Sequence, residues 1–127
     1  MSEFPLRDRT KAVALRVINL VNALPANDTG QIIGRQLLRS GTSVGANYRA
    51  SMRAKSRADM VNKLKIVEEE ADESLYWLEL LVEGNIVPES RLRPLMDELE
   101  EILSMTVASI RTMRGNERSY LVTPNYE

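Results

Sequence analysis

The sequence predicts an all-α protein, an antiparallel up-and-down four-helix bundle in which residues 1–127 form a single domain. Apolar residues recur at helical spacing in four stretches, and the alternation typical of strands is nowhere sustained. The segments between these stretches are short and contain Gly, Pro and Asn. Four long helices joined by short loops favour an antiparallel bundle. Because the chain has only one Trp, one Phe and four Tyr, its core is expected to be aliphatic.

The first two helices are expected over about residues 7–24 and 31–54. Pro25 ends the first helix, and residues 26–30 read as a short loop. The predicted apolar faces consist of Val13, Val17, Leu20, Val21 and Leu24 in the first helix, and of Ile33, Leu37, Val44 and Tyr48 in the second.

Small residues are concentrated in the middle of the second helix, where Gly41 and Gly45 lie. A glycine inside a helix costs roughly 1 kcal/mol relative to alanine, so a compensating contact is expected. The close approach of a neighbouring backbone would supply it. A break in the helix at either glycine is the alternative.

The third and fourth helices are expected over about residues 57–83 and 91–114, followed by a tail at 116–127. Ser56 and Asp59 have the spacing of a capping box at the start of the third helix. Their predicted apolar faces comprise Met60, Leu64, Val67, Ala71, Leu75, Leu78 and Val82, and Leu92, Leu95, Leu99, Ile102, Ile110 and Met113. Gly-Asn pairs at 84–85 and 115–116 are expected to end these helices.

Charge is unevenly distributed although the net charge is only −1. Residues 1–66 contain 12 basic and 4 acidic side chains, a net charge of +8. Residues 67–127 contain 5 basic and 14 acidic side chains, a net charge of −9. Such a split is compatible with nucleic-acid contact by the basic half. Equally, basic and acidic helices can lie side by side and neutralise each other.

Two residue types are absent from the sequence, and their absence limits the classes of function that the chain can have. Without cysteine or histidine, the chain lacks thiolate ligands, the commonest general base and the commonest zinc ligand. We therefore expect no enzyme activity, no catalytic residues, no cofactor and no metal. No apolar run is long enough to span a bilayer, and the first residues do not resemble a signal peptide, so we expect a cytoplasmic protein without membrane contact.

Four arginines of the second helix are the first candidate site. If the helix is continuous, its 100° step per residue places them in one stripe, opposite the apolar face. Arginine binds phosphate and carboxylate groups equally well, so the stripe is a candidate nucleic-acid contact. A solvated face is the alternative. The stripe consists of Arg35, Arg39, Arg49 and Arg53.

The third helix has a second apolar stripe, which predicts burial on two sides and hence an oligomer interface. Its apolar members are Ile66, Trp77, Leu80 and Leu81, and Glu70 and Glu73 lie among them. The two glutamates need partners because an unpaired buried charge is strongly disfavoured. Arginines of the second helix, in the same or another subunit, are the obvious candidates. We consider a structural ion pair a better explanation of Glu70 and Glu73 than a metal or acid–base site.

Two segments resemble a known family. Residues 35–50, RQLLRSGTSVGANYRA, and 63–81, KLKIVEEEADESLYWLELL, are similar to the bacterial four-helix-bundle proteins encoded in intervening sequences of 23S ribosomal RNA genes. The resemblance extends over about residues 7–114. It implies an antiparallel four-helix bundle assembled into a ring-shaped homo-oligomer, typically a homopentamer.

The resemblance also bears on the candidate residues. The family includes accessory proteins of diversity-generating retroelements, which bind reverse transcriptase and nucleic acid through a basic ring, and this implies nucleic-acid contact by the arginine stripe. Positions that match the family motifs and look structural are Asn47, Glu70, Ala71 and Glu73. Those accessory proteins are strongly basic, whereas this chain has a sequence pI of about 5.6.

The leading hypothesis is a non-enzymatic oligomeric scaffold that binds RNA or an RNA-handling protein through the arginine stripe. The alternative is a self-assembling protein-interaction module without nucleic-acid binding, which the acidic total favours. An enzyme is disfavoured by the absence of histidine and cysteine and of any convergent polar site.

Overall fold

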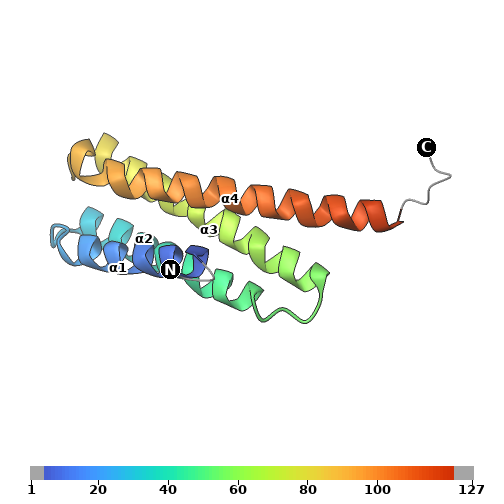
Figure 1. Cartoon of the computed structure of the whole chain (residues 1–127). Helices are drawn as coiled ribbons and strands as arrows, with labels where there is room; N and C mark the ends of the chain where they lie inside the picture. The colour runs from blue at the N-terminus through green and yellow to red at the C-terminus, as the bar shows by residue number, and fades with distance from the viewer. Residues whose placement is uncertain (1–4, 122–127) are drawn as a thin grey trace.

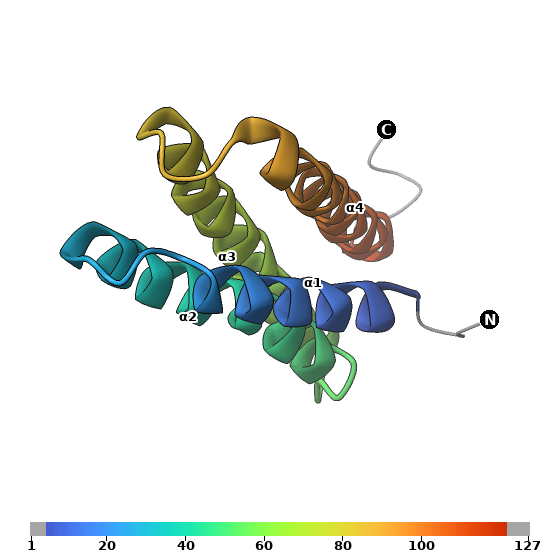
Figure 2. The same cartoon turned by 90° about the vertical axis from the view of Figure 1, so that its left-hand side faces the viewer.

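A computed structural model describes residues 5–121, with side chains over residues 5–115. Its helices are α1 (Pro5–Asn22), α2 (Asp28–Ser51), α3 (Arg57–Glu83) and α4 (Glu89–Leu121). Each helix packs against the next one in the chain, so the predicted all-α, up-and-down arrangement is confirmed. α1 meets α4 over a shorter stretch than it meets α2. Figure 2 shows that the axes of α1 and α3 run at a clear angle to each other.

The core is aliphatic, as composition predicts. α1 contributes Val13 and Val17, and α2 contributes Leu37 and Val44, all fully buried. α3 and α4 supply most of the rest, with buried residues at Leu64, Val67, Ala71, Leu75, Leu78 and Leu81 of α3 and Leu92, Leu95, Met96, Leu99, Ile102 and Ile110 of α4. A smaller cluster of Val61, Leu64 and Ile110 joins the first turns of α3 to the middle of α4.

The ends of α1 and α2 come earlier than predicted. Beyond Asn22, the amides of Ala23 and Leu24 donate to carbonyl groups three residues back, at 3.0 and 3.2 Å. The same tighter turn follows Ser51. Periodicity alone does not distinguish such a turn from a last helical turn, since it keeps the side chains close to the same face.

α2 begins at Asp28, three residues before the predicted start. The Asn27 side chain caps it by accepting a hydrogen bond of 2.8 Å from the amide of Gly30. Gly30 was predicted to lie in the loop, but it belongs to α2. Glycine is needed at this position because a Cβ would overlap the carbonyl oxygen of Pro25. The two glycines farther along do not break α2, which is continuous.

The two Gly-Asn pairs behave differently. At the end of α3, Asn85 adopts the left-handed conformation with φ 59°, and the amide of Ile86 donates to the carbonyl of Leu81 at 2.9 Å. That predicted end is confirmed. None of the described glycines, Gly115 included, has a positive φ, and α4 continues through this position to Leu121. The predicted tail was therefore wrong over residues 116–121, while residues 122–127 lie outside the described part of the chain. Figure 1 shows α4 projecting past the rest of the bundle.

Candidate nucleic-acid interface

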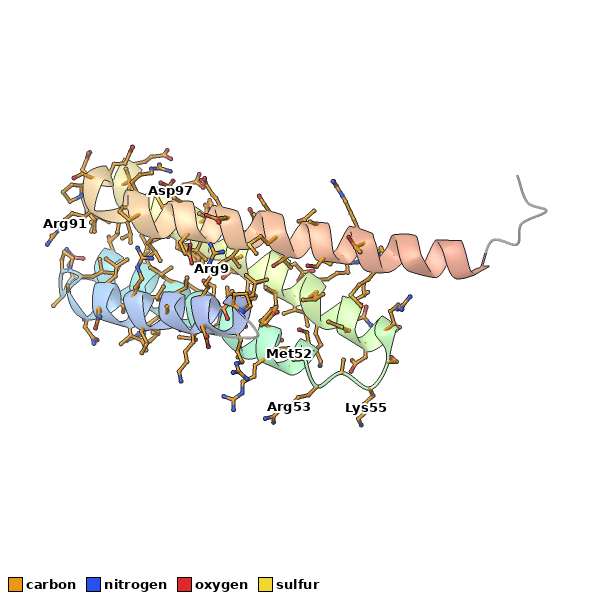
Figure 3. All side chains as sticks on the ribbon, in the orientation of Figure 1. Arg9, Met52, Arg53, Lys55, Arg91 and Asp97 are labelled. Carbon is orange, nitrogen blue, oxygen red and sulfur yellow. The ribbon has the colours of Figure 1, made fainter. Side chains whose placement is uncertain are left out.

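The predicted arginine stripe lies on the outer surface, but its members have different surroundings. Arg35, Arg39 and Arg49 belong to α2, whereas Arg53 follows the C-cap residue Met52. All four side chains are exposed. Arg53 and the neighbouring Lys55 project outward from the connection between α2 and α3 (Figure 3).

Arg39 is engaged in a network with α3. Its Nη1 donates to Oε2 of Glu70 at 3.0 Å, and its Nη2 contacts Oε2 of Glu73. Trp77 Nε1 donates to the same Glu73 oxygen at 3.1 Å. The Trp77 hydrogen bond, followed by the contact with Arg39, lowers the pKa of Glu73. The structural ion pair expected for the two glutamates is therefore present within one chain, and it occupies Arg39.

The other two arginines of the stripe, Arg49 and Arg53, line a groove between α1 and α2. Its volume is about 560 Å³, within the range of ligand-binding pockets. Arg49 and Arg53 line it from α2 and from the residues just beyond that helix. The complete lining is Arg7, Asp8, Lys11, Ala14, Thr42, Gly45, Ala46, Arg49, Met52 and Arg53.

Close packing of the two helices shapes the floor of this groove. A Cβ at Gly45 would stand 3.2 Å from the carbonyl oxygen of Thr10, a tight contact that would require the backbone of α1 to shift by a few tenths of an ångström. At Gly41, a Cβ would lie 2.8 Å from Cγ2 of Val17. The predicted compensation for glycine inside α2, the close approach of a neighbouring backbone, is confirmed at Gly45.

The groove differs electrostatically from the rest of the surface. Within residues 5–115, Lys11, Arg49 and Arg53 form no ion pair, whereas Arg9, Arg39 and Arg93 each do. Cationic side chains without a carboxylate partner keep their full capacity for an anionic ligand. Four basic residues and one acidic residue line the groove, so its local charge is strongly positive.

Sequence reasoning missed the contribution of α1. Arg7, Lys11 and Ala14 follow each other at steps of four and three, the spacing of one helix face. That pattern was a usable signal, but nothing in the sequence pairs this face with Arg49 of α2. The pairing comes from the antiparallel packing of α1 on α2.

Arg35 lies apart from the groove. It lines a smaller hollow of about 300 Å³ toward the connection between α1 and α2. Apolar residues such as Val21, Leu24 and Leu38 dominate that lining, and Arg35 is its only charged member. The four predicted arginines therefore do not form one site.

The predicted interface stripe on α3 is partly wrong. Leu81 is completely buried in the chain's own core, and Val82, which was predicted to face the core, also packs against it from a partly buried position. Trp77 and Leu80 are half-buried, and Ile66 is 36% exposed. Tyr76, which was not predicted, is 53% exposed, and its ring contacts the edge of Trp77 with centroids 5.1 Å apart. An exposed apolar strip thus remains on α3, without Leu81.

Three further findings concern the described residues. Their carboxylates form no group of three that could hold a metal ion. None of the described helices combines the length and apolar character that crossing a membrane requires. Asn47, a family-motif position, bonds within α2: its Nδ2 donates to the carbonyl oxygen of Ser43 at 2.9 Å.

Comparison with known proteins identifies the family of the chain. The model of the 23S rRNA-intervening sequence protein family matches residues 3–108, most of the chain. The chain belongs to this family. The groove, the Arg39 network and the glycines of α2 all lie within the matched segment.

One solved structure extends this relationship to three dimensions. It is a protein of unknown function from the S23 ribosomal protein family of Bacteroides thetaiotaomicron VPI-5482. It is 36% identical in sequence, with a TM-score of 0.78, over 83% of this chain and 97% of its own. A search of curated proteins gave no match. The family assignment and the four-helix fold are therefore mutually consistent.

Proposed function

We propose that this 23S rRNA-intervening sequence protein is a non-catalytic, homo-oligomeric scaffold that binds RNA through the groove between α1 and α2. The observation that carries the proposal is the concentration of unpaired basic side chains, Lys11, Arg49 and Arg53, around a groove of about 560 Å³. Arginine and lysine contacts to phosphate supply most of the affinity in non-specific nucleic-acid binding. RNA is the nucleic acid to test first because the family is described by reference to 23S rRNA.

The distribution of charge supports this assignment despite the acidic pI. Net charge governs long-range attraction, but a ligand in the groove responds to the local potential, because charges beyond about 10 Å are largely screened at 0.1 M salt. Carboxylates of α3 neutralise Arg39, and those of α4 neutralise Arg9. They leave Arg49 and Arg53 uncompensated.

Self-association is the second part of the proposal. The exposed strip on α3, formed by Ile66, Tyr76, Trp77 and Leu80, is an apolar surface that a second copy of the chain can cover. Family resemblance favours a ring-shaped homopentamer. A ring would place several copies of the basic groove on one assembly and raise the avidity for a long RNA.

Fluorescence anisotropy with labelled RNA tests the proposal, on protein whose assembly mass is known from light scattering. We expect binding that weakens steeply as salt rises, with a slope of about −0.7 per phosphate engaged on a single strand. Arg49→Ala with Arg53→Ala should weaken binding at least tenfold. The matched control, Arg91→Ala with Arg111→Ala, removes the same charge from exposed positions on α4 and should change affinity less than twofold.

A protein-interaction module without RNA binding is the second candidate. Exposed apolar side chains on α1 and α2 favour it, namely Leu15, Ile18, Ile32 and Leu38. A wild-type assembly that binds no RNA at 20–50 mM salt would contradict the RNA proposal and support this candidate. Equal loss of affinity in the two double variants would instead show that only overall charge matters.

A further inference from the structure

We infer that the groove accepts one unpaired nucleotide of a single-stranded RNA, with its phosphate at Arg49 and Arg53 and a donor group of its sugar or base at Asp8. This inference rests on the RNA-binding function proposed above. It specifies the conformation of RNA that the groove takes, and it gives Asp8 a role that phosphate binding alone does not explain.

The lining has two chemical parts. Lys11, Arg49 and Arg53 supply cations, whereas Ala14, Ala46 and Met52 supply small or apolar surface. A bare phosphate uses only the first part. A nucleotide uses both, because its base or sugar can pack on the methionine and alanine side chains while its phosphate meets the arginines.

Asp8 is the acidic member of this basic lining. It lies in the first turn of α1 and is exposed. Within residues 5–115 its carboxylate forms no ion pair and no hydrogen bond. A carboxylate repels phosphate but accepts hydrogen bonds from base amino groups and from ribose hydroxyls. The groove therefore matches a ligand that carries an anion and a donor together, as a nucleotide does.

A duplex fits these features poorly. Its bases are paired inside the helix, and it presents a continuous anionic backbone to a protein surface. Such a backbone can reach the basic side chains at the rim of the groove. It leaves the apolar floor unfilled and brings phosphate toward the Asp8 carboxylate, so single-stranded RNA should be preferred.

The volume agrees with an occupant larger than a phosphate ion. A groove of about 560 Å³ falls within the usual span of pockets for small organic ligands. Gly45, where α1 approaches α2 closely, is one of the lining residues. A larger residue at Gly45 would press on Thr10 of α1.

The experiment compares a labelled, unstructured single-stranded RNA with a duplex of the same length at one salt concentration. We expect the wild-type protein to prefer the single strand at least fivefold. Adenosine monophosphate should displace the single strand at lower concentration than inorganic phosphate does. The variant Asp8→Ala should weaken single-strand binding about threefold to tenfold, the loss expected for one typical hydrogen bond, and leave duplex binding unchanged or tighter.

The sign of the Asp8→Ala effect separates the two explanations. If the groove is only a patch of positive charge, removal of a carboxylate must tighten binding to both RNAs. The control Asp72→Ala removes one exposed carboxylate from α3 and reports that purely electrostatic effect. Thermal unfolding of each variant shows that the bundle is intact.

Each outcome is decisive. A preference for single strands that Asp8→Ala reduces supports the inference. Equal affinity for both RNAs, or tighter binding by Asp8→Ala to both, overturns the inference but leaves the RNA-binding function standing. Absence of binding to either RNA at low salt removes the proposed function and this inference with it.

Discussion

Arg9 of α1 holds Glu98 of α4 through two hydrogen bonds, 2.9 Å from Nε to Oε2 and 2.7 Å from Nη2 to Oε1. The same guanidinium lies 3.2 Å from Glu101 and 3.4 Å from the sulfur of Met105. In Figure 3, Arg9 lies between the two helices. Because α1 and α4 meet over only a short stretch, this paired contact is a principal connection between the first and last helices.

Replacement of Arg9 should destabilise the bundle. Arg9→Ala leaves the Glu98 carboxylate, whose side chain is 23% exposed, without its bidentate partner. We expect the free energy of unfolding to fall by about 1–2 kcal/mol, measured by urea denaturation. Arg93→Ala is the control because Arg93 reaches only acids of its own helix at 3.4–3.8 Å, and it should cost less than about 0.5 kcal/mol. Equal costs for the two variants would contradict the role of Arg9.

Stability should also depend on the ionisation of Glu98. The hydrogen bonds from Arg9 outweigh partial burial and lower the pKa of Glu98 in the folded protein. Its stabilising contribution is therefore complete above the unfolded pKa of about 4.3 and is lost as the pH falls through the folded value. The unfolding free energy should decline with acidification below about pH 4.5, and less steeply in Glu98→Gln. If the unfolding free energies of wild type and variant declined in parallel with pH, Glu98 would not be a source of this pH dependence.

Two glycines should respond oppositely to alanine. A Cβ at Gly41 would press on Val17, which is fully buried and stiff at χ1, so Gly41→Ala should destabilise by about 1–3 kcal/mol. A Cβ at Gly115 would meet nothing within 4 Å, so Gly115→Ala should stabilise α4 by up to about 1 kcal/mol. Thermal denaturation of the two variants measures both changes in stability, a loss for Gly41→Ala and a gain for Gly115→Ala. Stabilisation by both substitutions would mean that the α1–α2 contact is looser than described.

The exposed strip on α3 can be tested through assembly mass. Ile66→Glu should lower the mass measured by light scattering from about 72 kDa, five chains of 14.4 kDa, to that of a monomer. The bundle should stay folded, because Ile66 is 36% exposed within the chain. Trp77→Glu is a less specific variant, since Trp77 also donates a hydrogen bond to Glu73. Ile32→Glu on α2 is the control, and an unchanged mass for Ile66→Glu would place the interface elsewhere.

The sequence was sufficient to predict the four helices because a 3.6-residue apolar period persists over several turns in each. Helix ends were harder to predict. Gly115 read as a terminator, yet its φ is not positive, and only local backbone conformation separates it from the true terminator at Asn85. Leu81 and Val82 are 100° apart on the wheel, yet both contact the core, Leu81 fully buried and Val82 partly buried.

The candidate site was only half predictable. A helical wheel treats each helix by itself, so it placed Arg39 and Arg49 in one stripe although α3 occupies Arg39 with carboxylates. It also assigned Arg53 to a helix that ends at Ser51. The pairing of Glu70 and Glu73 with an arginine of α2 was predicted correctly because buried carboxylates require a cation. Arg7, Asp8 and Lys11 were missed because their relation to Arg49 exists only after α1 packs on α2.

The division of charge between the two hairpins makes the molecule an electric dipole. Residues 1–56, which include α1 and α2, contain 9 basic and 3 acidic side chains, a net charge of +6. Residues 57–127, which include α3 and α4, contain 8 basic and 15 acidic side chains, a net charge of −7, so the two sides carry opposite potentials while the total is nearly zero. A polyanion that approaches such a molecule exerts a torque on it, and this torque orients the α1–α2 side toward the polyanion before contact. Near neutral pH and low ionic strength, the protein should therefore be retained by both cation and anion exchangers, which its pI of about 5.6 alone would not suggest.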